Sequence, residues 1–229
     1  MAKEKEIINI DGFRTKGSTL VQYTGKDESV VIPDGIKRIK VQAFDWNTSI
    51  RSVVFPDSVT IIGREAFCMC INLEEVVLSN RLTDIGYSAF CNCHSLQSIR
   101  IPDTVREIGA RAFARCFALA NVKLPEGIDT IPDSTFLKCG SLSDIEIPSN
   151  VEVIERTAFE DCLSLESVSF LPGKKIWLWD RAFKNCVKLR TITGDDRIAS
   201  IFYNCFEGCE NLTEVPYRHE PWKGYSWCR

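Results

Sequence analysis

The sequence has little of what most enzyme active sites use. His94 and His219 are its only histidines, and the neighbouring Cys93 and His94 do not form a nucleophile–base pair, because adjacent side chains rarely face each other at hydrogen-bond distance. No phosphate-binding loop, dinucleotide fingerprint or H-E-x-x-H motif is present. We therefore expect a protein that is not an enzyme and that holds no cofactor.

The chain also lacks long apolar runs and an excess of basic charge. No apolar stretch approaches the roughly 20 residues that a membrane-spanning helix needs. With 28 basic and 31 acidic residues the formal net charge is −3, which does not suit the basic footprint of a nucleic-acid-binding protein. We expect no transmembrane segment and no nucleic-acid partner, and the oligomeric state stays open.

The first residues contain no apolar stretch of about 7–15 residues, the length that a secretory signal requires. The 11 cysteines are odd in number, so they cannot all pair within the chain, and a reducing compartment suits them better. We expect a cytoplasmic protein. The alternative is a secreted or cell-surface protein from which a signal has been removed.

A strict repeat organises most of the chain. Phenylalanine recurs every 23 residues, with one step of 24 between Phe159 and Phe183. A fixed period of this length is typical of a solenoid, in which each unit packs on its neighbours. The repeated phenylalanines are Phe44, Phe67, Phe90, Phe113, Phe136, Phe159, Phe183 and Phe206.

Each repeat has three parts. Alternating apolar residues such as Ile99 and Ile101, often followed by proline, predict a short half-buried strand. A turn and a second apolar pair follow, for example Val105 and Ile108. The third part reads Ala-Phe-x-x-Cys, and its spacing predicts a single helical or 3₁₀ turn.

This combination resembles the BspA-like leucine-rich repeat family. Residues 96–116 match that family's unit, L-x-x-I-x-I-P-x-x-V-x-x-I-G-x-x-A-F-x-x-C, at nearly every position, and the resemblance covers roughly residues 30–215. It implies a leucine-rich-repeat solenoid. We expect a curved, strand-rich mixed β/α solenoid of about eight repeats over residues 29–215, with strands on its concave face. Residues 1–28 and the aromatic residues 216–229 are expected to cap its ends.

The best candidate binding surface is the outer face of the predicted strands, since a solenoid's concave sheet is its usual binding surface. Side chains at one repeat position should line up, so the face changes from apolar to basic to acidic along the array. We expect a non-catalytic scaffold that binds a protein there. The candidate residues are Ser52, Val54, Glu75, Val77, Ser98, Arg100, Asn121, Lys123, Asp144, Glu146, Ser167 and Ser169.

Two other functions stay open. The resemblance implies an alternative, a surface adhesin that recognises host protein or glycan, because many members of the family are surface proteins implicated in adhesion. Trp177 and Trp179, in the irregular repeat, are a possible secondary binding site.

The other alternative is a metal- or redox-responsive protein. Seven cysteines occupy one repeat position and form a cysteine ladder that we interpret as small core residues. Cys68 and Cys91 lie outside that ladder, one repeat apart. With His94 they are candidate metal ligands, or a pair that forms a labile disulfide, although their spacing is not the usual one for zinc. The simplest interpretation is that they are surface thiols and that no metal binds.

Overall fold

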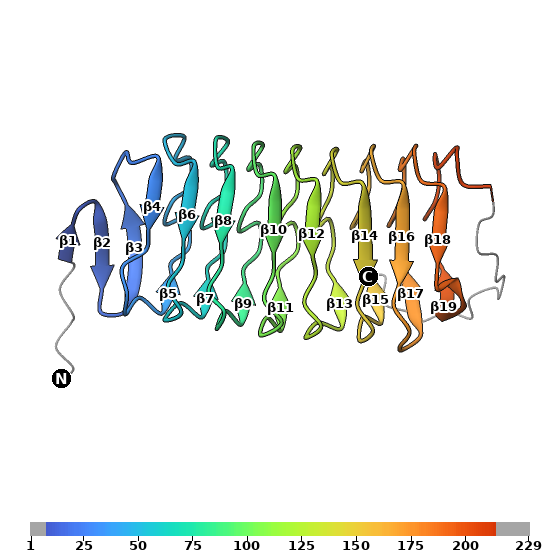
Figure 1. Ribbon diagram of the computed structural model, residues 1–229, viewed down its shortest axis with the longest axis horizontal. Helices are drawn as coiled ribbons and strands as arrows, with labels where there is room; N and C mark the ends of the chain where they lie inside the picture. Colours follow the sequence, from blue (N-terminus) through green and yellow to red (C-terminus); the bar gives the residue numbers. More distant parts are fainter. Residues whose placement is uncertain (1–7, 214–229) are drawn as a thin grey trace, which may run out of the picture.

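The computed structural model describes residues 8–213, and these form one solenoid of stacked turns (Figure 1). Each repeat contributes one longer strand to a first parallel ladder and one shorter strand to a second ladder. Partners in both ladders are one repeat apart, as in Val30 with Val53 and Val53 with Val76. The predicted solenoid of about eight turns is confirmed. The predicted C-terminal cap, 216–229, lies outside the described residues.

The first ladder carries the strands that the sequence predicts. Their central residues, such as Val53 and Ile99, point into the core, while the residues on either side point outward. The strands are β4 (Ser29–Val31), β6 (Ser52–Val54), β8 (Glu75–Val77), β10 (Ser98–Arg100), β12 (Asn121–Lys123), β14 (Asp144–Ile147), β16 (Ser167–Phe170) and β18 (Thr191–Thr193).

The second ladder is formed around the second member of the second apolar pair of each repeat, such as Ile108, in a segment for which the sequence predicted a turn and no strand. Its strands are mostly two residues long, and the last residue of each short strand is buried. They are β5 (Arg38–Ile39), β7 (Ile61–Ile62), β9 (Asp84–Ile85), β11 (Glu107–Ile108), β13 (Thr130–Ile131), β15 (Val153–Ile154), β17 (Ile176–Leu178) and β19 (Ile198–Ile201).

The Ala-Phe-x-x-Cys segment is not the helical turn that its spacing predicts. Alternate amides donate within the segment to the carbonyl three residues back, as Ala66 does to Gly63, while the amides between them donate to the next repeat, as Phe67 does to Ala89. Glu65 and Met69 adopt left-handed φ values of 54° and 61°, which close two tight turns instead of a helix. Within residues 8–213 the only helix is η1 (Asp195–Arg197), a single 3₁₀ turn.

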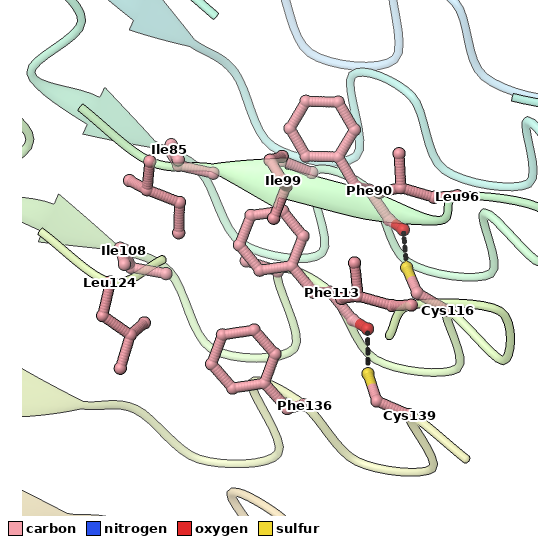
Figure 2. Close-up of a cluster of buried hydrophobic side chains, with 14 of the residues drawn as sticks. Ile85, Phe90, Leu96, Ile99, Ile108, Phe113, Cys116, Leu124, Phe136 and Cys139 are labelled. Atoms are coloured by element: carbon pink, nitrogen blue, oxygen red, sulfur yellow. Dashed lines mark hydrogen bonds between the residues drawn. The ribbon is translucent and has the colours of Figure 1, made fainter. Parts of the chain in front are cut away.

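A stack of phenylalanine rings forms the centre of the core. Neighbouring rings lie 4.4–5.6 Å apart between centroids and are nearly parallel, and Phe67 through Phe183 are fully buried. Figure 2 shows three of them, Phe90, Phe113 and Phe136, beside the ladder cysteines. Aromatic stacking adds about 0.5–1.5 kcal/mol per pair beyond burial, so every repeat stabilises its neighbours.

The N-terminal residues cover the first turn of the solenoid. β1 (Ile8–Ile10), β2 (Phe13–Lys16) and β3 (Thr19–Tyr23) form an antiparallel meander whose last strand pairs with β5. Tyr23 continues the phenylalanine stack, 5.0 Å from Phe44, and Phe13 follows 4.8 Å beyond it. Burial and a hydrogen bond to Asp27 raise the pKa of Tyr23 to about 12, so its hydroxyl stays neutral.

The extra residue of the irregular repeat lies in the loop between β16 and β17. Phe170 pairs with Ile147, which is 23 residues earlier in the sequence, whereas Leu178 pairs with Ile154, which is 24 residues earlier. The side chain of Arg197, 3% exposed, fills this region and donates hydrogen bonds to five main-chain carbonyls. Those acceptors belong to Pro148, Ser149, Val151, Leu171 and Lys174.

Candidate binding surface

The structure brings all twelve predicted strand-face residues onto one side of the solenoid. They occupy the outward positions of β6 to β16, and parallel pairing aligns them in two rows, as in Ser98 with Asn121 and Arg100 with Lys123. The register follows from the repeat, because partners are one unit apart. Whether this surface binds anything stays a prediction.

A hollow of about 580 Å³ lies over the middle of this face. It crosses the junction between β12 and β14, where the first ladder is interrupted between two hydrogen-bonded segments. Eight of the twelve predicted residues line it, and we call this region the charged hollow. They are Ser98, Arg100, Asn121, Lys123, Asp144, Glu146, Ser167 and Ser169.

The four charged side chains of the hollow take no part in the ion pairs of the described residues. Arg100 and Lys123 lie on its basic side and Asp144 and Glu146 on its acidic side, and all four are exposed. None of the ion pairs within residues 8–213 uses any of them. They are therefore free to pair with groups of opposite charge on a partner.

An apolar strip adjoins the basic side of the hollow. Val31, Val54 and Val77 follow one another in register across β4, β6 and β8, and their exposed fractions are 66%, 38% and 45%. A smaller hollow lies between Val77 and Arg100. The remaining two predicted residues, Ser52 and Glu75, flank this strip. The face therefore runs from apolar to basic to acidic.

Trp177 and Trp179 lie on a different side of the molecule, at β17 in the second ladder (Figure 1). They point outward, 39% and 44% exposed, and Leu178 between them is fully buried, as strand alternation predicts. The ring of Trp179 lies 6.0 Å from that of Phe202. The tryptophans and the predicted strand face therefore belong to different ladders of the solenoid, and a binding role for the tryptophans stays a prediction.

The cysteine ladder has a defined hydrogen-bonding role. Each thiol donates to the carbonyl of the phenylalanine in the preceding repeat at 3.1–3.3 Å, as Figure 2 shows for Cys116 and Cys139. Burial raises the pKa of Cys139 well above its ordinary value, so the thiol stays protonated. The ladder consists of Cys70, Cys93, Cys116, Cys139, Cys162, Cys186 and Cys209.

The three residues proposed as metal ligands do not come together. Cys68 and Cys91 are hydrogen-bonded to each other through their side chains, whereas the ring of His94 packs against Phe117 at 4.8 Å. No group of three His, Cys, Asp or Glu side chains in residues 8–213 is arranged to hold a metal ion. The cysteine pair remains as a site of thiol chemistry.

Sequence reasoning missed Arg197 and the charged groups around Cys91. The only signal for Arg197 is that the last repeat lacks the apolar strand end and the proline of the earlier repeats. Arg111 and Arg115 lower the pKa of Cys91. Arg111 and Arg115 lie two residues before and two residues after Phe113. Side chains at one repeat position align in successive turns, so the placement of these arginines in the turn next to Cys91 could have been predicted from the sequence.

Comparison with known proteins identifies the repeat. The profile of the BspA type leucine rich repeat region matches residues 17–142, 60–177 and 129–220. The chain belongs to the BspA-type leucine-rich repeat family. No curated protein matches its sequence. None of the helices within residues 8–213 has the length and hydropathy to cross a bilayer.

Several solved structures, among them leucine-rich repeat proteins, are similar to this one. The leucine-rich repeat protein of T. pallidum is 30% identical, with 93% of this chain and 90% of that chain covered and a TM-score of 0.62. A leucine-rich repeat protein from Bacteroides ovatus is 22% identical, with 91% of this chain and 72% of that chain covered and a TM-score of 0.59. The pneumococcal vaccine antigen PcpA is 20% identical, with 89% of this chain and 49% of that chain covered and a TM-score of 0.63. The last two similarities concern the fold alone.

Proposed function

We propose that this BspA-type protein is a non-catalytic scaffold that binds a protein partner along its strand face, centred on the charged hollow. The observation that carries the proposal is the hollow itself, whose four charged side chains make no ion pair within the described part of the chain. A hollow that carries positive and negative charges suits recognition of a partner surface with the opposite charges.

The order of apolar, basic and acidic side chains along the face defines the kind of surface that the partner needs. A complementary protein segment would place apolar side chains against Val54 and Val77, acidic ones against Arg100 and Lys123, and basic ones against Glu146 and its neighbours. Electrostatic complementarity of this kind sets specificity and association rate more than total affinity. The segment would lie across the strands, because the chemistry changes from strand to strand.

Charge reversal tests this function. We expect the double substitution Arg100→Glu and Lys123→Glu to weaken partner binding by at least about tenfold, because each reversed charge meets an acidic group. The partner is first captured with the wild-type protein as bait, and its affinity is then measured by calorimetry. The free energy of unfolding should stay within about 0.5 kcal/mol of the wild-type value, since both side chains are exposed.

The matched control reverses two exposed basic residues, Arg38→Glu and Lys40→Glu, on the second ladder. It changes the net charge of the protein by the same amount but leaves the charged hollow intact. The proposal requires the control to bind like the wild type. Equal affinity for both double variants would contradict it.

We also propose that the protein works in a reducing compartment. The ladder thiols support this location, because each donates its proton to a phenylalanine carbonyl, and a disulfide between rungs would remove two such hydrogen bonds. Alkylation under denaturing, non-reducing conditions should therefore label all 11 cysteines of protein isolated from its source. Ladder disulfides in that material would instead favour a secreted protein.

A further inference from the structure

We infer that Cys91 and Cys68 form a dithiol site that reacts with small hydroperoxides, with Cys91 as the attacking thiolate and Cys68 as the thiol that closes the disulfide. The two residues lie at the same position of successive turns. Backbone hydrogen bonds join these two turns on both sides of the pair, from the amide of Phe67 to the carbonyl of Ala89 at 2.8 Å and from the amide of Met69 to the carbonyl of Cys91 at 2.9 Å. The main chains are thus held one rung apart.

That spacing allows a disulfide without rearrangement. Neighbouring rungs of a parallel ladder lie about 4.8 Å apart, within the range of about 4.4–6.8 Å between the Cα atoms of bonded cysteines. The ladder thiols have the same spacing, but each is directed to a main-chain carbonyl. Cys68 and Cys91 hydrogen-bond to each other, as only Cys186 and Cys209 do among the described ladder thiols.

The charges around the pair differ between its two ends. The hydrogen bond with Cys91 and burial raise the pKa of the Cys68 thiol, and the charges of Asp45 and Glu65 add smaller contributions in the same direction. The carboxyl of Asp45 is itself held towards the neutral form by burial and by Glu65. Cys68 therefore remains the proton donor of the pair.

The surroundings of Cys91 have the opposite effect. The hydrogen bond from Cys68 lowers the pKa of Cys91 to about 7, with further contributions from Arg111, Arg115 and a hydrogen bond from Ser88, while burial opposes them. The side-chain amide of Asn92 also donates to its sulfur at 3.3 Å. A thiolate, not a thiol, is the nucleophile in cysteine chemistry.

Access also separates this pair from the ladder. Cys91 is 7% exposed and Cys68 is more exposed still, whereas Cys70 and Cys93 of the same two repeats are fully buried. A small hydroperoxide is therefore expected to reach Cys91 before Cys70 or Cys93. The fully buried ladder thiols, Cys70 to Cys186, serve as the internal control for the reactivity of the pair, whereas Cys209 at the end of the ladder is 9% exposed and does not.

The chemistry balances in two steps. The Cys91 thiolate attacks one peroxide oxygen, the O–O bond breaks, and the leaving alkoxide or hydroxide takes a proton from solvent, which leaves a sulfenic acid. Cys68 then attacks that sulfur, the S–O bond breaks, and the hydroxide leaves as water with the Cys68 proton. Two sulfurs lose two electrons in total and the peroxide gains them. Two molecules of a small thiol then reduce the disulfide by exchange and become a disulfide themselves, which restores both cysteine thiols.

The test uses the full-length reduced protein and hydrogen peroxide at a few-fold excess. After alkylation under denaturing conditions, intact mass and peptide mapping should show one disulfide, between Cys68 and Cys91, that a reductant removes. Cys68→Ser should stop at a sulfenic acid on Cys91 that a dimedone probe traps, and Cys91→Ser should form neither product. No reaction, or oxidation of ladder cysteines at the same rate, would overturn the inference.

A second measurement separates reactivity from folding. Arg111→Gln with Arg115→Gln should slow alkylation of Cys91 in the native protein at pH 7 by about fivefold, the loss of thiolate expected if its pKa rises from about 7 to about 8. Lys138→Gln, one repeat further on, is the control and should not change the rate. Equal rates in all three proteins would remove the proposed role of the arginines.

Discussion

The ladder cysteines contribute a hydrogen bond as well as volume. The thiol of Cys139 donates to the carbonyl of Phe113 at 3.3 Å, and that carbonyl also accepts from the amide of Cys116. Removing the thiol therefore costs one hydrogen bond without leaving the carbonyl unpaired. Asn47, which replaces cysteine in the first repeat, accepts hydrogen bonds from the amides of Ser49 and Ile50, so this position is polar throughout.

Cys139→Ala should lower the free energy of unfolding by roughly 0.5–1 kcal/mol more than Cys205→Ala does. Both substitutions delete one buried sulfur atom, but Cys205 occupies the position where most other repeats have alanine. Denaturant unfolding of the two variants measures the difference. Equal losses would show that the thiol acts only by filling space.

Single residues were predicted well where their position in the repeat decides their surroundings. The outward placement of Arg100 and Lys123 follows from the 23-residue period, because parallel partners are one repeat apart. The lowered pKa of Cys91 was not predicted, although the positions of Arg111 and Arg115 follow from the repeat. Its largest cause is the hydrogen bond from Cys68, which depends on the orientation of both side chains and not on the period alone.

Among the elements, the longer strands were predicted and the shorter ones were not. The alternating apolar residues Ile99 and Ile101 identify β10, whereas β11 has only two residues and its sequence predicts a turn. The expected helical turn at Ala-Phe-x-x-Cys failed for a related reason. Left-handed residues without glycine, such as Glu65 and Met69, divide that segment into two tight turns, and the pairing with the next repeat compensates for their backbone strain.

The loop before β17 depends on Arg197, whose guanidinium group bonds five carbonyls. We expect Arg197→Met to lower the free energy of unfolding by about 3 kcal/mol, because buried carbonyls lose a charged donor. The control, Arg190→Met, removes an exposed ion pair with Glu166 and should cost less than about 1 kcal/mol. Chemical denaturation compares the two, and similar losses would contradict the assigned role.

At the scale of the whole molecule, stability should pass from neighbour to neighbour. Within the stack from Phe44 to Phe206, each phenylalanine ring packs face to face on the rings of the neighbouring repeats. In such an array, stability is approximately the sum of the repeats and their interfaces. The strand face is therefore as rigid as the interfaces behind it, and the charged hollow, near the middle of the stack, is supported from both sides.

This arrangement predicts that the position of a defect matters more than its size. Phe113→Ala, in the middle of the stack, should cost about 3–5 kcal/mol and should divide the single unfolding transition into two, one for each half of the array. Phe206→Ala, at the end of the stack and only partly buried, should destabilise the last turn alone. Hydrogen exchange followed by mass spectrometry resolves the two outcomes by repeat. A single, equally cooperative transition in the Phe113→Ala protein would mean that coupling extends beyond nearest neighbours.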